Sequence, residues 1–278
     1  MARDRAGAPA PADRGDADGG TRRVLSSVRN AARLLKEFSV REPELGVTEL
    51  AGRLGVGKST VHRLLSTLVA EDLVEQDPTT GRYRLGIAVH DLGGAVSAGS
   101  NLQASALLPM SELRNRTGET VQIGVLDGRD VVYVDRLDSP NTLRLFVDVG
   151  RRADAHATGT GKCLLAFLPP DQLDHLLDGW DLPRRTPHTI TSHADLRRNL
   201  LKVRRLGYAV NLNESEQGVL SVAAPIRDPS GRVVAAISVA GPSQRMEPAL
   251  GTIARAVCEA GAATSRRMGW RHRAPDPA

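Results

Sequence analysis

The chain of 278 residues has room for one or two domains, and its 41% apolar residues allow a sizeable core that is mostly aliphatic, because aromatic residues make up only 3%. Its 37 basic and 32 acidic residues give a net charge of +5, which permits nucleic-acid binding without requiring it. The composition excludes a disulfide framework and a cysteine-based metal site, since the two cysteines lie outside any C-x-x-C pattern, and no apolar run reaches the ~18 residues that span a membrane. The first 22 residues lack the apolar segment of a secretory signal, so we expect a reduced, cytoplasmic protein.

The N-terminal segment divides into a tail and a helix. Residues 1–22 are rich in Ala, Gly, Pro, Asp and Arg and have almost no large apolar side chain, so we expect a disordered tail. Residues 24–40 place apolar side chains at helical spacing, with Ser26 or Ser27 as the expected N-cap. Pro43 lies in the segment that ends this helix.

Residues 47–70, VTELAGRLGVGKSTVHRLLSTLVA, allow two interpretations. Their letters match the phosphate-loop pattern G-x-x-x-x-G-K-[ST] from Gly52 to Ser59, which would indicate a nucleotide hydrolase. A phosphate loop follows a buried strand, whereas residues 47–54 repeat apolar side chains with the period of a helix. A second helical period follows a glycine-containing turn and leaves polar and basic side chains on its outer face. The stretch therefore favours a helix-turn-helix, with Thr48 as the N-cap of its first helix.

A hairpin and a connecting helix come next. The strand-like runs LVEQ and RYRL surround a turn at residues 77–81, so residues 23–86 are predicted to form a winged helix-turn-helix. Arg82 and Arg84 alternate onto one face of the second strand, where they either meet DNA phosphates or form a solvated edge. A weakly periodic helix over residues 87–101 is the expected linker.

Residues 102–268 mix strands and helices, which predicts an α+β domain. The Asp127-Gly128 turn joins strands expected at residues 121–126 and 131–137. We expect further strands at residues 143–147, 208–210, 219–226 and 233–240. The expected helices cover residues 102–117, 163–168, 171–178, 193–206 and 247–267, and residues 269–278 form a tail.

Taken together, these segments resemble the IclR family of bacterial transcriptional regulators from Val24 to Met268. The resemblance rests on the order and spacing of SSVRNAARLL, GKSTVHRLLSTL, TGETVQIGVLDGRDVVYVDRLDS, HATGTGKCLLA, GYAVN and VAAPIRDPSGRVVAAISVAGPSQR. It implies an N-terminal winged helix-turn-helix, a linker helix and a C-terminal effector-binding domain similar to the GAF fold. Members form dimers or tetramers, bind palindromic operators and respond to small molecules, often organic acids or aromatic catabolites. We therefore expect a DNA-binding regulator, acting as a repressor.

The second helix of the helix-turn-helix would enter the major groove of operator DNA. Basic side chains can contact phosphates or a guanine edge, and hydroxyl groups can contact either bases or phosphates. The expected DNA contacts are Lys58, Ser59, Thr60, His62, Arg63, Ser66, Arg82 and Arg84.

The segment Gly159-Thr160-Gly161 leads into a helix, where free backbone N–H groups and the helix dipole favour an anion; a purely structural turn is the alternative. Lys162 either pairs with that anion or is solvated. The resemblance implies an effector pocket formed by Leu145, Ala153, Gly159, Thr160, Asn211, Ser221, Ser238 and Ala240. The best-known family pattern has Asp, Cys and Ser at positions 211, 221 and 240, so this chain lacks one charge and one hydroxyl there.

No residue pattern indicates catalysis or metal binding. His156 has no accompanying nucleophile motif such as G-x-S-x-G, and Cys163 lies in an apolar helix where it is expected to pack. We expect no enzyme activity, no cofactor, no metal and no membrane; the expected partners are double-stranded operator DNA, a small-molecule effector and further copies of the chain. Two other classes stay open, namely a nucleotide hydrolase using the segment from Gly52 to Ser59 and a ligand-independent DNA-binding protein.

Overall fold

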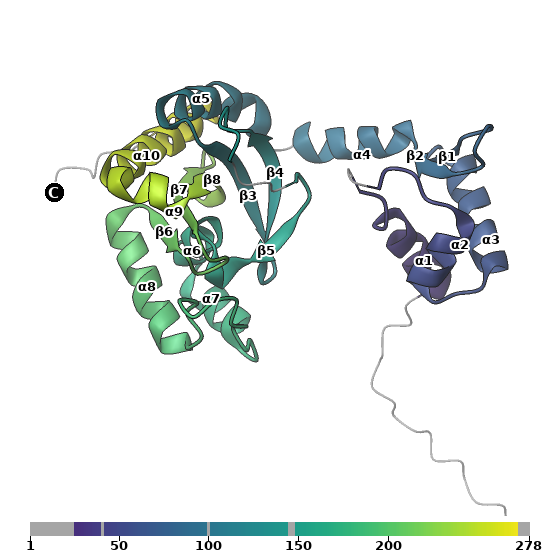
Figure 1. Ribbon diagram of the computed structural model, residues 1–278, viewed down its shortest axis with the longest axis horizontal. Helices are drawn as coiled ribbons and strands as arrows, with labels where there is room; N and C mark the ends of the chain where they lie inside the picture. The colour runs from purple at the N-terminus through teal and green to yellow at the C-terminus, as the bar shows by residue number, and fades with distance from the viewer. Residues whose placement is uncertain (1–24, 40–41, 99–100, 144–147, 272–278) are drawn as a thin grey trace, which may run out of the picture. The chain divides into compact units, whose positions relative to one another are not determined.

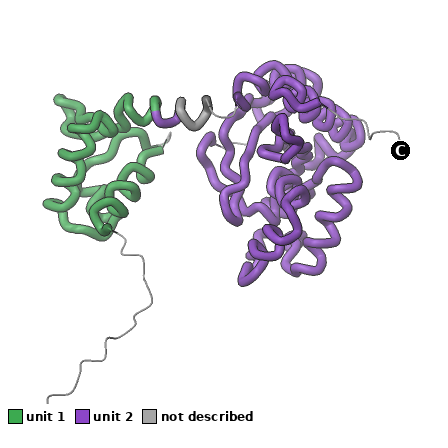
Figure 2. The backbone as a smooth tube through the Cα atoms, turned by 180° about the vertical axis from the view of Figure 1, so that it is seen from behind, with its two compact units in different colours: residues 1–91 green, residues 92–278 purple. Residues whose placement is uncertain are grey.

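The computed structural model describes residues 25–39, 42–98, 101–143 and 148–271 (Figure 1). The chain forms two compact units, residues 1–91 and 92–278, and the division falls within helix α4 (Ile87–Ala98) (Figure 2). This helix lies where the linker was expected. The tail predicted for residues 1–22 lies outside the described residues.

Unit 1 is a winged helix-turn-helix, as predicted. Its elements are α1 (Ser26–Leu35), α2 (Val47–Leu54), α3 (Lys58–Ala70), β1 (Val74–Gln76) and β2 (Tyr83–Leu85). The two strands are antiparallel, with Val74 opposite Leu85. The apolar stripes of the three helices meet in one core that includes Leu34, Leu50 and Leu65, all 0% exposed. Burial of these stripes, rather than helix propensity alone, holds such short helices.

The turn between α2 and α3 is built on two glycines. Gly55 ends α2 with a φ of +69°, a left-handed conformation that glycine adopts without a Cβ clash, and Gly57 is the N-cap of α3. Two cap predictions are wrong. Thr48 lies inside α2, because Gly46 donates its backbone N–H to the Glu49 carboxylate at 2.7 Å and the helix begins at Val47. Likewise α1 begins at Ser26 after the N-cap Leu25, so neither early serine caps it.

Unit 2 is built on a six-stranded antiparallel sheet with the strand order β5-β4-β3-β8-β7-β6 (Figure 1). The strands are β3 (Thr120–Asp127), β4 (Asp130–Leu137), β5 (Arg152–Asp154), β6 (Ala209–Leu212), β7 (Val219–Arg227) and β8 (Val233–Pro242). The helices are α5 (Leu102–Thr117), α6 (Gly159–Ala166), α7 (Pro170–Leu177), α8 (His193–Leu206), the short α9 (Ser243–Met246) and α10 (Leu250–Arg267). This arrangement confirms the predicted α+β class.

The two faces of the sheet have different characters because side chains alternate along a strand. Helices α5 and α10 cover the face that carries Val121, Ile123 and Val239, and this is the larger apolar core (Figure 1). Helices α6 and α8 pack with a second core that includes Tyr133 and Ala223. The same face of the sheet also carries polar side chains, which form part of a pocket described below.

Several element predictions differ from the structure. Leu143 is outside any strand, and the rest of the strand predicted for residues 143–147 lies outside the described residues. Helix α6 begins at Gly159 instead of Cys163, because the Thr158 hydroxyl caps it by accepting the N–H of Gly161. None of the described helices is long and apolar enough to cross a lipid bilayer.

Candidate DNA-contacting helix and effector pocket

Helix α3 presents a polar outer face. Val61, Leu65 and Leu68 are buried against the core of unit 1. All six residues predicted on this helix for DNA contact are exposed: Lys58, Ser59, Thr60, His62, Arg63 and Ser66. Ser66 donates its hydroxyl to the backbone oxygen of His62 at 2.9 Å and so returns to its own helix. The N-terminal half of α3 therefore offers the side chains that can reach a neighbouring molecule.

The arginines of the wing are paired with carboxylates. Arg82 donates to Glu49 Oε2 at 2.8 Å and to the backbone oxygen of Glu44 at 2.9 Å. Arg84 donates to Glu75, and this hydrogen bond raises the pKa of the Arg84 guanidinium. A phosphate would have to compete with these carboxylates for the same N–H groups.

The phosphate-loop interpretation of Gly52 to Ser59 is wrong. The segment runs from the end of α2 through the glycine turn into α3, and the residues before it are helical. A phosphate loop needs a strand at this position so that its backbone N–H groups wrap the phosphates.

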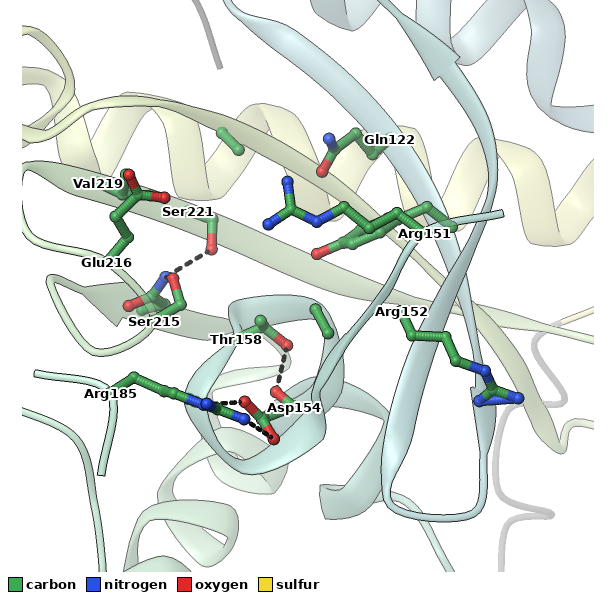
Figure 3. Close-up of a pocket in the computed structure, with 15 residues that line it drawn as sticks. Gln122, Arg151, Arg152, Asp154, Thr158, Arg185, Ser215, Glu216, Val219 and Ser221 are labelled. Atoms are coloured by element: carbon green, nitrogen blue, oxygen red, sulfur yellow. Dashed lines mark hydrogen bonds and ion pairs between the residues drawn. The ribbon is translucent and has the colours of Figure 1, made fainter. Parts of the chain in front are cut away.

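A pocket of about 340 Å³ opens on the polar face of the sheet in unit 2 (Figure 3). This volume lies within the range of small-molecule sites. Figure 3 shows Arg151 extending across the pocket toward Ser221 and Gln122, whereas Arg152 points away from them. The lining residues are Gln122, Tyr133, Arg151, Arg152, Ala153, Asp154, Ala157, Thr158, Arg185, Asn211, Ser215, Glu216, Val219, Ser221 and Ala240.

The predicted effector residues fall into three groups. Four of them line the pocket: Ala153, Asn211, Ser221 and Ala240. Gly159, Thr160 and Ser238 are buried beside it without forming its wall. Leu145 lies outside the described residues.

The backbone at the start of α6 is already hydrogen-bonded. Gly161 N–H donates to the Thr158 hydroxyl at 3.0 Å, and Gly159 N–H donates to Ser221 Oγ at 3.3 Å. The prediction of free N–H groups is therefore wrong for these two glycines. Their lack of a side chain serves packing, because a Cβ on Gly161 would lie 2.2 Å from the backbone oxygen of Ala155.

Asn211 organises one wall of the pocket. Its Nδ2 donates to Ser215 Oγ at 2.9 Å and to Ser221 Oγ at 3.4 Å, and its Oδ1 accepts the Glu214 N–H at 2.8 Å. An amide donates from both hydrogens and accepts at its oxygen, so Asn211 has used its donors. A carboxylate at this position could not donate to either serine.

Lys162 neither faces an anion in the pocket nor lies in solvent. It is 0% exposed and forms an ion pair with Glu214 on the loop after β6. Burial lowers the pKa of Lys162 and raises the pKa of Glu214, while the mutual attraction opposes both shifts. Because the neighbouring Ser215 and Glu216 line the pocket, this pair fastens a pocket wall to α6.

Models of known families match both units. Residues 94–266 match the bacterial transcriptional regulator IclR C-terminal family, and residues 27–78 match the IclR helix-turn-helix domain. The chain belongs to the IclR family. It is therefore a DNA-binding transcriptional regulator, and the resemblance inferred from its motifs is confirmed.

Individual proteins of the family resemble most of the chain. The HTH-type transcriptional regulator XynR of Escherichia coli K12 is 35% identical over 89% of this chain and 98% of its own length. The HTH-type transcriptional repressor AllR of Salmonella typhi is 34% identical over 72% of this chain and 74% of its own length. The structure of an IclR homolog from Microbacterium hydrocarbonoxydans, complexed with 4-hydroxybenzoate, is 28% identical, covers 87% of this chain and 99% of its own, and superposes with a TM-score of 0.79.

Two titratable side chains of unit 2, His156 and Cys163, are buried. His156 is buried, its Nε2 lies 3.0 Å from the backbone oxygen of Pro183, and its ring meets Trp180 edge-on. Burial lowers the pKa of His156 and raises the pKa of the packed Cys163 thiol. Nowhere in the described chain do three His, Cys, Asp or Glu side chains gather as metal ligands.

Sequence reasoning missed several residues that line the pocket. They include Gln122, Tyr133, Arg151, Asp154, Thr158, Arg185 and Glu216. One signal was available for Gln122, because Thr120 and Gln122 are polar alternate residues in an otherwise apolar strand. No comparable signal brings the loop residue Arg185 to its ion pair with Asp154, 31 residues away.

Proposed function

We propose that this regulator binds palindromic operator DNA as a homo-oligomer through α3 and represses transcription until a small organic or aromatic acid occupies the pocket. The observation that supports this most directly is the exposed polar face of α3 within a domain of the IclR helix-turn-helix family. In domain terms, residues 23–86 bind DNA, residues 87–101 connect, and residues 102–268 bind the effector. As a bacterial DNA-binding protein, it acts in the cytoplasm.

The DNA contacts would come mainly from the N-terminal half of α3. Recognition helices of this motif enter the major groove with their N-terminal residues at the base edges. Arg63 can donate two hydrogen bonds to guanine, and Lys58, Ser59, Thr60 and His62 lie close enough in sequence to meet bases or phosphates. Ser66 lies one turn further along α3 and donates its hydroxyl to the backbone of its own helix, so we assign it at most a contact to the DNA phosphates. Arg82 and Arg84 would add phosphate contacts from the wing.

The pocket favours an anionic effector. Of the three arginines in its lining, Arg151 extends across the cavity, whereas Arg152 points away and pairs with Asp127 and Asp130. Arg185 is held by Asp154, with Nη2 at 3.1 Å from Oδ1. Tyr133 supplies aromatic surface. In the Microbacterium homolog the bound molecule is 4-hydroxybenzoate, an acid with an aromatic ring, and we propose an effector of this general kind here.

Exposed apolar side chains support self-association. Leu25 beside α1, Val28 on α1 and Ile87 on α4 are 68%, 61% and 71% exposed. Exposed apolar side chains that gather into a patch often mark a protein–protein interface. A two-fold dimer would present two copies of α3 to the two halves of a palindrome.

The decisive experiment measures binding of the full chain to DNA from its own promoter region by fluorescence anisotropy, at several salt concentrations, with and without small carboxylates. We expect nanomolar binding that weakens with salt and changes at least several-fold with one acid. Binding that no acid changes would support the ligand-independent alternative, and absence of binding would refute the proposal.

A further inference from the structure

Two adjacent rows of mostly polar side chains cross the sheet beneath the pocket. Residues opposite each other in an antiparallel sheet point to the same face. In β3 and β8, Gln122 lies opposite Ser238, while in β7 Ser221 lies opposite Ala240 of β8 and Asn211 of β6. Because side chains alternate, all five point to the pocket side, away from the core formed with α5 and α10.

Two amides in these rows differ in their hydrogen bonding. The Asn211 amide donates to two serine hydroxyls and accepts one backbone N–H. Gln122 is 1% exposed and lines the pocket, yet its Nε2 has no hydrogen-bond partner among the residues that the structure describes. Ser238 Oγ, on the residue opposite Gln122, is likewise buried without such a partner. Buried polar groups of folded proteins are normally satisfied, so each exception requires an explanation.

The Ser221 hydroxyl has a proton to offer. Its oxygen accepts hydrogen bonds from Gly159 N–H at 3.3 Å and from Asn211 Nδ2 at 3.4 Å. A hydroxyl oxygen has two lone pairs, so both are used, and the remaining hydrogen-bonding capacity is the O–H donor. Ser221 of β7 lies directly opposite Ala240 of β8, while Gln122 of β3 lies opposite Ser238, two residues before Ala240. The two donors are therefore diagonal neighbours across β8, and the small side chain of Ala240 leaves space beside them.

We propose that Gln122 is a specificity-determining residue: it selects effectors by donating from Nε2 to a second oxygen of the bound acid, while Ser221 donates to another oxygen. Gln122 lines the cavity, so rotation of its terminal amide brings Nε2 to the ligand. The ligand class is an acid carrying an additional hydroxyl or carbonyl oxygen, as opposed to a plain hydrocarbon acid. This inference rests on the proposed function, because it assumes that the pocket holds the effector.

The first test requires no ligand. Replacement of Gln122 by methionine keeps the length of the side chain and removes the unpartnered amide, so we expect the melting temperature of the unliganded Gln122→Met protein to rise. The matched control is Asn211→Leu, which removes an amide whose groups are all bonded, and its melting temperature should fall. A fall for Gln122→Met comparable to that of Asn211→Leu would mean that Gln122 is held by a bound water or plays a structural role, and would overturn the inference.

The second test measures selectivity. Calorimetric titrations of the full chain use two pairs of probes that differ by one oxygen, namely 4-hydroxybenzoate against benzoate and lactate against propionate. In the natural protein we expect the oxygenated member of at least one pair to bind about tenfold more tightly, which is the usual contribution of one hydrogen bond. In Gln122→Met the preference should fall to about one, with little change for the plain acid.

The outcomes separate this inference from the proposed function. If Gln122→Met keeps the preference, or if none of the four probes binds the natural protein, Gln122 does not select the effector as proposed. The proposed function fails independently, if the natural protein binds a probe and loses no operator affinity in its presence, or if it binds no operator.

Discussion

The DNA-binding unit and the effector unit hold their proposed recognition side chains in opposite ways. On α3 these side chains are exposed, and only the apolar core beneath the helix fixes their position. In the pocket, Asn211, Ser215 and Ser221 are joined to one another by hydrogen bonds. The helix therefore presents separable contacts, whereas the pocket wall is a connected network in which one substitution alters its neighbours.

The ion pairs of the two units differ in the same way, because those of the wing are exposed and the pair near the pocket is buried. The wing pairs Arg82 with Glu49 and Arg84 with Glu75, and all four side chains are at least 41% exposed. Water and salt screen such pairs, so they contribute little to stability. Lys162 and Glu214, by contrast, are 0% and 12% exposed, which makes the loss of either partner severe. The following experiments test this contrast, beginning with the largest expected effect.

Removing the buried cation should have the largest effect. We expect Lys162→Met to lower the free energy of unfolding of the effector unit by about 3–5 kcal/mol, because Glu214 is left buried without its partner. Denaturant unfolding of the full chain, followed by circular dichroism, measures the loss. Adding Glu214→Leu to Lys162→Met should restore most of it, and Arg84→Met should cause no measurable change. If Lys162→Met left the free energy of unfolding unchanged, the buried pair would contribute no more to stability than the exposed pairs of the wing.

Removing one exposed recognition side chain should impair function without affecting stability. We expect Arg63→Ala to weaken operator binding by about 1–3 kcal/mol, the usual contribution of a good side-chain contact to a base, while the melting temperature stays the same. Anisotropy titrations at two salt concentrations measure this effect. Arg198→Ala, on the exposed part of α8 in the other unit, is the control. Equal affinities for Arg63→Ala and the natural protein would exclude Arg63 from the interface.

Mild acid should destabilise the effector unit through His156. Burial lowers the pKa of this histidine in the folded protein, so the unfolded chain binds the proton more tightly and stability declines as the pH falls below about 6.5. The loss is at most about 1.4 kcal/mol per pH unit. The free energy of unfolding, measured at pH 7.5, 6.5 and 5.5, should depend less on pH for His156→Gln than for the control His175→Gln, which changes an exposed side chain. Parallel curves for the two variants would contradict this assignment.

The smallest effect is expected at the wing. Because Glu75 already holds the Arg84 guanidinium, a phosphate gains little by replacing it, and we expect Arg84→Ala to weaken operator binding less than about threefold. Operator titrations of Arg84→Ala and Arg63→Ala under the same conditions measure the difference in affinity. A larger loss for Arg84→Ala than for Arg63→Ala would show that the wing, instead of α3, carries the main contact.

The sequence predicted which residues are exposed on α3 better than it predicted the partners of buried residues. Periodicity alone identifies the outer face of α3, and it defines α8 at its observed limits of His193–Leu206. The partner of Lys162 could not be found in this way, since Glu214 is 52 residues away and only the fold brings them together. The same applies to the glycines at the start of α6, whose N–H groups looked free in the sequence and are bonded in the structure. A pattern shows which face a residue occupies, but not which residue meets it there.

The alternation in the central strands has a consequence for how this regulator can change over evolutionary time. In β3 and β8, Val121, Ile123, Val239 and Ile237 pack in the core, whereas Gln122, Ser238 and Ala240 face the pocket side. Under the proposed function, neighbouring positions serve different purposes, because one set packs the core and the other contacts the ligand. New effector specificities can arise by substitution on one side of a strand while the core on the other side is inherited unchanged.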